Sequence, residues 1–164
     1  MKVTELPLCR KRLGRALWVA VLFTLAACSS EQDPVEAHVR ALVAQIEQSI
    51  ESRSVREAVD YLHADYTDPR HTDRRAAGAS LFGLLQRHRT IHLFSLIETV
   101  QPAGDQGSAE AVVYVAMTGV PVDSVDAVIS LKADLYRFEL GLVEDAGEWR
   151  VIRSRWERVD PRVL

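Results

Sequence analysis

The sequence predicts an α+β domain in which three N-terminal helices pack on a curved antiparallel sheet of about four strands. Up to about residue 88, apolar residues recur at helical spacing, and from residue 91 they follow strand spacing. Helices grouped before a run of strands indicate an α+β fold with the helices on one face of the sheet. We expect this domain at residues 34–158, with a C-terminal tail at residues 159–164.

A basic and then apolar leader precedes the domain. Residues 1–15 carry five basic residues and one acid, and the apolar run of residues 16–27 follows. This order is typical of a secretory signal, and the run is shorter than the roughly 20 residues that a membrane span needs. Cys28 stands directly after Leu25-Ala26-Ala27.

This segment resembles the lipobox of bacterial lipoprotein precursors. The resemblance implies a diacylglycerol on the thiol of Cys28, cleavage before that residue, and acylation of the new amino terminus; two or more acyl chains anchor a protein durably. Residues 1–27 would be the signal peptide and residues 28–33 a lipidated tether. Ser29, where such lipoproteins can carry an aspartate, implies the outer membrane facing the periplasm. The alternative is a plain signal peptide or signal anchor with a chance cysteine.

The charge of the chain limits the partners that we expect, and its cysteine content limits the disulfides. The whole chain has 20 basic and 23 acidic residues; the leader holds five and one, so 15 and 22 remain, a formal charge of −7. An acidic domain argues against nucleic acid as a partner and against electrostatic attraction to an anionic membrane. Cys9 leaves with the leader and the thiol of Cys28 is consumed by lipid, so we expect no disulfide in a mature chain of one domain.

Three helices are expected. Asp33-Pro34 opens the first, with Glu36 in its first turn, and a capping box at Ser54 opens a shorter second helix that runs through Leu62. Thr72-Asp73 caps the third helix after Asp-Pro has ended regular structure. The first helix has an apolar stripe of Val35, Val39, Leu42, Val43, Ile46 and Ile50 opposite Glu36, Arg40, Glu47 and Glu51; the third has Ala77, Leu81, Leu84, Leu85 and His88 on one face.

Two antiparallel pairs of strands follow. Residues 91–100 and 109–118 flank a Pro- and Gly-containing turn, and residues 131–144 and 148–158 flank Asp145-Ala146-Gly147. Residues 123–130 form either a helical turn or an irregular connection. Trp149 and Trp156 are seven residues apart, so in a regular strand they point to opposite faces.

The order of elements resembles the nuclear transport factor 2-like superfamily of cystatin-like cones over residues 34–158. The similar features are the capped first helix, the Asp-Tyr-Thr-Asp-Pro segment at residues 65–69, and the closing hairpin with Gly147-Glu148-Trp149-Arg150-Val151 and Trp156. The resemblance implies a cone that encloses a pocket. It also implies activities such as those of ketosteroid isomerases, dehydratases and polyketide cyclases, although one fold hosts many functions.

Asp68 is the one catalytic candidate. In the ketosteroid isomerases an Asp-Pro after the second helix supplies the general base, and Asp68-Pro69 stands at the matching place; an apolar pocket would raise the Asp68 pKa. That family's oxyanion partners, a Tyr from the first helix and a protonated Asp from a strand, are missing, because the first helix has no Tyr and residues 109–118 have no Asp. A turn residue that caps local backbone is therefore the favoured interpretation.

Other patterns give weaker candidates. We expect no cofactor. We also expect no metal site: His88 and His92 have helical metal spacing, but the helix ends near Arg89, so the two side chains point in different directions. A serine hydrolase is unsupported, because there is no Gly-x-Ser-x-Gly elbow and Ser80 lies inside a helix. The arginines of the last strand are expected to pair with acids such as Glu139 and Glu157. Candidate binding residues are Tyr61, His63, Tyr66, Tyr114 and Trp156.

The sequence thus favours a non-catalytic envelope lipoprotein whose cone binds a small apolar ligand or a protein partner. The alternative is a pocket enzyme of the isomerase, dehydratase or cyclase type that uses Asp68 as general base, with Tyr61, His63 or Tyr66 nearby. A homodimer built on the open sheet face is a third possibility.

Replacement of Cys28 by serine tests the anchor. Cys28→Ser should abolish the incorporation of labelled fatty acid and release the protein from the membrane pellet, because the hydroxyl does not accept the diacylglycerol. Labelling and fractionation of cells that express each form measure both effects. A variant that is still labelled and still pellets would contradict the lipobox interpretation.

Overall fold

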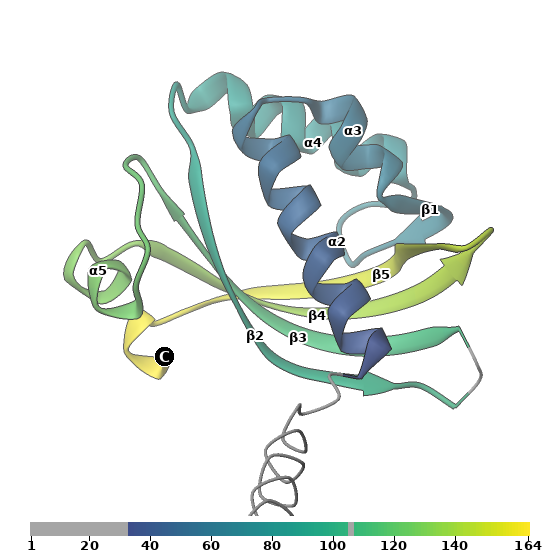
Figure 1. Ribbon diagram of the computed structural model, residues 1–164. Coiled ribbons are helices and arrows are strands. Elements are labelled where there is room, and N and C mark those ends of the chain that lie inside the picture. The colour runs from purple at the N-terminus through teal and green to yellow at the C-terminus, as the bar shows by residue number, and fades with distance from the viewer. Residues whose placement is uncertain (1–32, 105–106) are drawn as a thin grey trace, which may run out of the picture. The chain divides into compact units, whose positions relative to one another are not determined.

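The computed structural model describes residues 33–104 and 107–164, so Cys28 and the leader lie outside the described residues. Figure 1 shows the course of the chain. The elements in order are α2 (Pro34–Glu51), α3 (Val55–Asp60), β1 (Leu62–Thr67), α4 (Arg74–Arg87), β2 (His92–Pro102), β3 (Ser108–Thr118), α5 (Val125–Ser130), β4 (Asp134–Asp145), β5 (Glu148–Val159) and the 3-10 turn η1 (Pro161–Val163). None of the described helices has the length and hydropathy needed to cross a bilayer.

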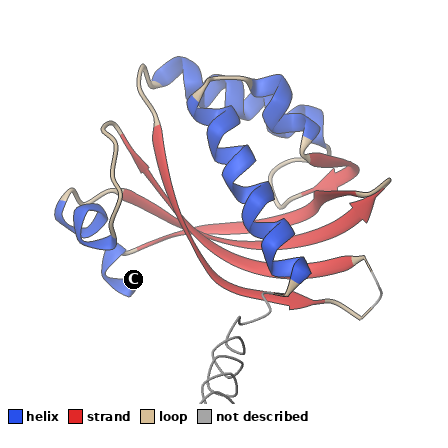
Figure 2. Cartoon of the chain, in the orientation of Figure 1, coloured by secondary structure: helices blue, strands red, loops and turns tan. Residues whose placement is uncertain are grey.

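The sheet has five strands in the order β1-β5-β4-β3-β2, and it curls around the helices (Figure 2). Strands β2 to β5 form the expected antiparallel meander, but β1 pairs in parallel with β5. The sheet therefore has one strand more than expected, and this edge strand makes it mixed instead of purely antiparallel. Leu62, expected at the end of a helix, begins that strand, because its partner Val151 lies far along the chain and no local pattern reports the pairing.

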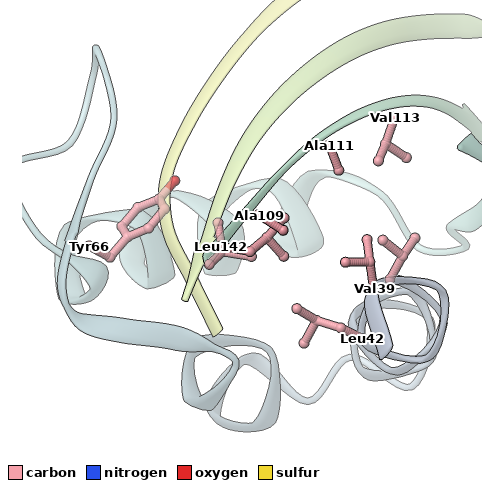
Figure 3. Close-up of a cluster of buried hydrophobic side chains, with 9 residues drawn as sticks. Val39, Leu42, Tyr66, Ala109, Ala111, Val113 and Leu142 are labelled. Atoms are coloured by element: carbon pink, nitrogen blue, oxygen red, sulfur yellow. The ribbon is translucent and has the colours of Figure 1, made fainter. Parts of the chain in front are cut away.

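Helix α2 covers one half of the sheet's inner face. The side chain of Asp33 caps it by accepting from the N–H of Val35 at 2.9 Å, as expected. In Figure 3, Val39 points from α2 toward Ala111 and Val113 of β3. Leu42 points from the same helix toward Ala109 and Leu142, and all of these side chains are buried. Complete burial of each large aliphatic side chain contributes about 1.5–3 kcal/mol, so this contact holds the helix on the sheet.

Residues 123–130, which the pattern left open, contain the short helix α5 (Val125–Ser130). The hydroxyl of Ser124 accepts from the N–H of Ala127 at 3.4 Å and caps it. Val128 is completely buried in a second, smaller core with Ala116 and Leu135, and Leu164 of the tail packs against it. This core lies at the α5 end of the sheet, apart from the α2 contact (Figure 1).

A β-bulge in β5 reverses one expectation. Leu142 pairs with Val151 and Gly141 with Arg153, so Ile152 is an extra residue without a partner in β4. An extra residue shifts the alternation of side chains by one position. Trp149 and Trp156 therefore both face the helices: Trp149 packs on the main core, and Trp156 lines a cavity with residues of α4. The expectation that they point to opposite faces is wrong.

Two glycines of α4 give a matched test of the helix packing. A Cβ added at Gly78 would lie 2.6 Å from Cγ2 of Val59, whereas one at Gly83 would meet only the guanidinium of Arg87 at 3.5 Å. Overpacking costs about 1–3 kcal/mol, and replacing a helical Gly by Ala contributes about 1 kcal/mol. Urea unfolding should show Gly78→Ala destabilised by about 1 kcal/mol and Gly83→Ala stabilised by about 0.5–1 kcal/mol. Equal shifts in the two variants would contradict the close contact between α3 and α4.

Candidate functional site

A largely apolar cavity lies between the helices and the inner face of the sheet. It consists of three adjoining hollows of about 530, 290 and 190 Å³, and Ile50 of α2 and Phe138 of β4 line all three. Leu81 and Leu84 of α4 form one wall, and Val115 of β3 forms the other. The interior is concave and apolar with a few polar groups, which is the usual character of a small-molecule site.

Five polar residues of this cavity form one hydrogen-bonded chain. The hydroxyl of Tyr66 lies 2.8 Å from both Oγ of Ser154 and Oδ2 of Asp68. Nδ1 of His71 lies 2.8 Å from the same Oδ2, and Nε2 of His71 lies 2.7 Å from Oγ of Ser80. All five residues line the largest of the three hollows, so the chain joins β5, β1, the following loop and α4 across its wall.

Asp68 is the centre of the chain, and its side chain is only 2% exposed. Its Oδ1 accepts from the backbone N–H groups of Arg70 at 2.7 Å and His71 at 2.9 Å. Burial acts to raise the Asp68 pKa, but hydrogen bonds from the His71 ring, the Arg70 backbone, the Tyr66 hydroxyl and the His71 backbone outweigh it and lower the pKa below its ordinary value. Asp68 is thus ionised at neutral pH.

This lowered pKa differs from the expectation for a general base in an apolar pocket. Asp68 does line the cavity, but the sequence did not indicate the four donors that surround its carboxylate. A carboxylate already saturated with donors is a weak base. The favoured interpretation, a turn residue that caps local backbone, describes Oδ1 well but leaves out the contacts of Oδ2.

The charge on Asp68 fixes the hydrogen-bond directions around it. An ionised carboxylate only accepts, so Tyr66 and Nδ1 of His71 both donate to Oδ2. Because Tyr66 donates its one hydroxyl proton to Asp68, Ser154 is the donor in the contact between the two hydroxyl groups. In the neutral imidazole, Nε2 of His71 then carries the lone pair and accepts from Ser80. Burial raises the pKa of Tyr66 far above its ordinary value; the hydrogen bond from Ser154 lowers this pKa and the contact with Asp68 raises it, so the phenol stays neutral.

His71 is the group best placed to move a proton. A carboxylate on one ring nitrogen holds the tautomer and stabilises the imidazolium that forms when the other nitrogen takes a proton. The side chain is 18% exposed, so the ring lies at the cavity wall but within reach of solvent.

Ser80, His71 and Asp68 also repeat the contact order of a Ser-His-Asp triad. Ser80 lies in the middle of α4, where backbone N–H groups are bonded within the helix and none is free to hold an oxyanion. The geometry therefore supports proton transfer rather than attack by the serine, in line with the absence of a nucleophile elbow.

Aromatic side chains and one cation complete the wall beside this chain. Trp156 packs edge-on against Tyr136, with ring centroids 5.8 Å apart, and lies 6.2 Å from Phe138. The guanidinium of Arg70 lies 3.9 Å above the Trp156 ring, within the range of a cation–π contact. Arg70 lines the same hollow as His71, so it brings a positive charge to the polar end of the cavity.

Three of the candidate residues line the cavity: Tyr66, Asp68 and Trp156. The other candidates lie elsewhere. Tyr61 lines a different hollow with residues of α2 and the β4–β5 hairpin. His63 lies near Asp65 at 3.8 Å and Asp145 at 3.9 Å, outside the cavity. Tyr114 packs beside the second core. Residues 33–104 and 107–164 contain no cluster of His, Cys, Asp and Glu able to hold a metal.

Arginines of the last strand pair with acids, as expected, but their ion pairs are with acids other than Glu139 and Glu157. Arg153 contacts Glu110 at 2.5 Å, Arg137 contacts Glu139 at 2.6 Å, and Arg155 lies directly opposite Glu139 in the register. Arg158 pairs with Asp134 instead of an acid of its own strand.

Sequence reasoning missed His71, Ser80, Ser154 and Glu47 as cavity residues. His71 follows Asp68 by three residues in a turn, which is the one local signal for their contact. Ser154 depends on the bulge in β5. Glu47 was expected on the polar face of its helix, but it lines the smallest hollow, because it stands four residues after Val43 and three before Ile50 at the edge of the apolar stripe.

No family model and no curated protein matches the chain. Solved structures do match it. An uncharacterised protein with a cystatin-like fold from Caulobacter vibrioides is 17% identical, with a TM-score of 0.59 over 80% of this chain and 94% of that one. A nuclear transport factor 2-like protein of unknown function from Pseudomonas putida is 16% identical, with a TM-score of 0.56 over 74% and 84%.

A third similar structure is a ketosteroid isomerase-like protein from Erwinia carotovora atroseptica. It is 13% identical, with a TM-score of 0.55 over 76% of this chain and 96% of that one. At such identities the likeness shows the fold alone. The described domain therefore has the nuclear transport factor 2-like, cystatin-like cone fold that the element order predicts.

Asp68→Asn tests the hydrogen-bonded carboxylate. Because the folded-state pKa lies below the ordinary value of about 3.9, ionised Asp68 contributes stability that is complete above that value and lost as pH falls through the folded pKa. Urea unfolding between pH 3 and 7 should show that the stability difference between wild type and variant is largest near neutrality and shrinks toward pH 3. A difference that does not depend on pH would contradict the lowered pKa.

Proposed function

We propose that this protein is a lipid-anchored envelope protein whose cone binds a small, largely apolar molecule. The observation that carries the proposal is the apolar cavity, with its hydrogen-bonded chain confined to one wall. A molecule with an apolar body and one polar group matches that distribution, because the body removes apolar surface from water and the polar group meets the polar wall and the guanidinium of Arg70. The leader and Cys28 support the anchored location.

Two substitutions on β3 test whether the cavity is the binding site. Val115 lines the two smaller hollows, whereas Val112 lies on the open face of the same strand. The full chain, purified natively from membranes in mild detergent, should release a small molecule on solvent extraction. Val115→Phe, which fills the cavity, should reduce the recovered amount at least tenfold, and Val112→Phe should retain it. Mass spectrometry measures the yield, and equal yields from both variants would contradict the proposal.

A second candidate function is a proton-transfer enzyme, and the His71–Asp68 pair favours it. In this mechanism Asp68 stays ionised and positions His71, and Nε2 takes a proton from a carbon next to a carbonyl group, directly or through Ser80. Arg70 would stabilise the enolate oxygen that develops. The base is then His71 and not Asp68.

Hydrogen exchange on an aromatic ketone tests this second function. In D2O the wild-type protein should accelerate deuterium incorporation into the methyl group of 2-acetylnaphthalene over buffer. His71→Gln should remove about 10²- to 10⁴-fold of that rate, the usual contribution of a general base. His63→Gln is the matched control, because His63 lies outside the cavity. Mass spectrometry of the ketone measures exchange, and no acceleration by wild type would leave ligand binding alone.

A further inference from the structure

Glu47 is a second carboxyl group in the cavity, away from the Asp68 chain. It lies on α2 and lines the smallest hollow, whose other walls are mostly apolar side chains of α2 and of strands β1 to β5. Tyr66 and Ser154 line the same hollow, so a molecule inside it would meet Glu47 and the end of the hydrogen-bonded chain.

One oxygen of Glu47 is unsatisfied. Oε1 is fully buried and has no hydrogen-bond partner among the described residues. The side chain and backbone of Ser95 on β2 hydrogen-bond to the carboxyl group, so the group is held in place. A buried polar atom without a partner destabilises a fold by about 1–3 kcal/mol, and it calls for an explanation such as a ligand contact.

The surroundings of Glu47 favour its neutral form. Burial raises its pKa, the hydrogen bonds from Ser95 lower it, and the nearby charge of Glu51 raises it, with a net rise. A neutral carboxylic acid has one O–H to donate, whereas a carboxylate only accepts.

We propose that the carboxyl group of Glu47 is the hydrogen-bonding contact for an acceptor oxygen, a carbonyl or ether, on the small apolar molecule that fills this cavity. The inference rests on the proposed binding function and names the recognition group and the chemical class. The acceptor oxygen takes the carboxyl O–H, and the apolar body of the molecule lies against Val113, Val115 and Phe138. Glu47 thus selects among apolar molecules for those with an acceptor oxygen.

A matched pair of probes and three variants test the inference. The probes are 2-acetylnaphthalene, which has a carbonyl acceptor, and 2-ethylnaphthalene, which has the same shape without one. Glu47→Leu removes the donor, Glu47→Gln keeps an N–H donor, and Glu51→Gln is the control one turn away, where the carboxylate already accepts from the N–H of Leu93. Fluorescence titration of the full chain gives both dissociation constants.

At a pH low enough for Glu47 to be protonated, wild type should bind the ketone about three- to tenfold more tightly than the hydrocarbon, the range expected for one hydrogen bond. Glu47→Leu should reduce this ratio to about one, while Glu47→Gln and Glu51→Gln retain it. Equal binding of both probes by wild type, or an unchanged ratio in Glu47→Leu, would overturn the role of Glu47 and leave the cavity as a binding site. Binding of neither probe would overturn the binding function and the inference with it.

The ratio should also fall as pH rises through the Glu47 pKa, because the ionised group no longer donates. The other ionisable groups near it are Glu51 on α2, His92 beside Glu51 on β2, and Tyr66 on β1; the apolar residues of β3 and β4 that line the hollow contribute none. Glu47→Gln should abolish this pH dependence, whereas Glu51→Gln should keep it but shift it to lower pH, because the charge of Glu51 raises the Glu47 pKa. A pH dependence that survives in Glu47→Gln would overturn the assignment to Glu47.

Discussion

The ionised carboxylate of Asp68 is the interaction on which the polar wall of the cone depends. It is almost completely buried, and a buried charge persists only when donors replace water. Two backbone N–H groups, a phenol and an imidazole supply that replacement. The same contacts tie the loop after β1 to α4 through His71 and Ser80 and to β5 through Tyr66 and Ser154. The hydrogen bonds around the Asp68 carboxylate thus connect the edge strand β1, helix α4 and strand β5.

The cone holds two carboxyl groups whose environments act in opposite directions. Asp68 has four hydrogen-bond donors and a lowered pKa, whereas Glu47 has only Ser95, a neighbouring acid and a raised pKa. Carboxyl groups whose pKa values are shifted in opposite directions are suited to different chemical roles. Asp68 can hold a positive or proton-accepting partner such as His71, and Glu47 can donate to an oxygen where it is protonated. The two lie at different parts of one cavity, which gives a bound molecule an orientation.

Local patterns predicted most of the fold and little of the site. Asp33, Asp73 and the apolar stripe of α2 act through neighbours in sequence, so the helices were foreseen. The edge strand β1 depends on the distant Val151, and the common face of Trp149 and Trp156 depends on one bulged residue. Such features need the register between strands, which no local pattern carries. For the same reason the sequence indicated Asp68 but neither its lowered pKa nor its hydrogen bond with His71.

The taper of the cone follows from side-chain size along β3. At one end Ala109 and Ala111 are small, so Leu42 and Val39 of α2 pack directly on the strand and fill the space. At the other end Val115 and Met117 face a region where the large rings of Tyr136, Phe138 and Trp156 lie on β4 and β5. These rings pack against one another, edge-on or tilted, and the aliphatic side chains of α2 and α4 do not fill the remaining volume. A core that packs tightly at one end and stays open at the other offers a rigid wall for a ligand, since the closed end fixes α2 without help from anything bound.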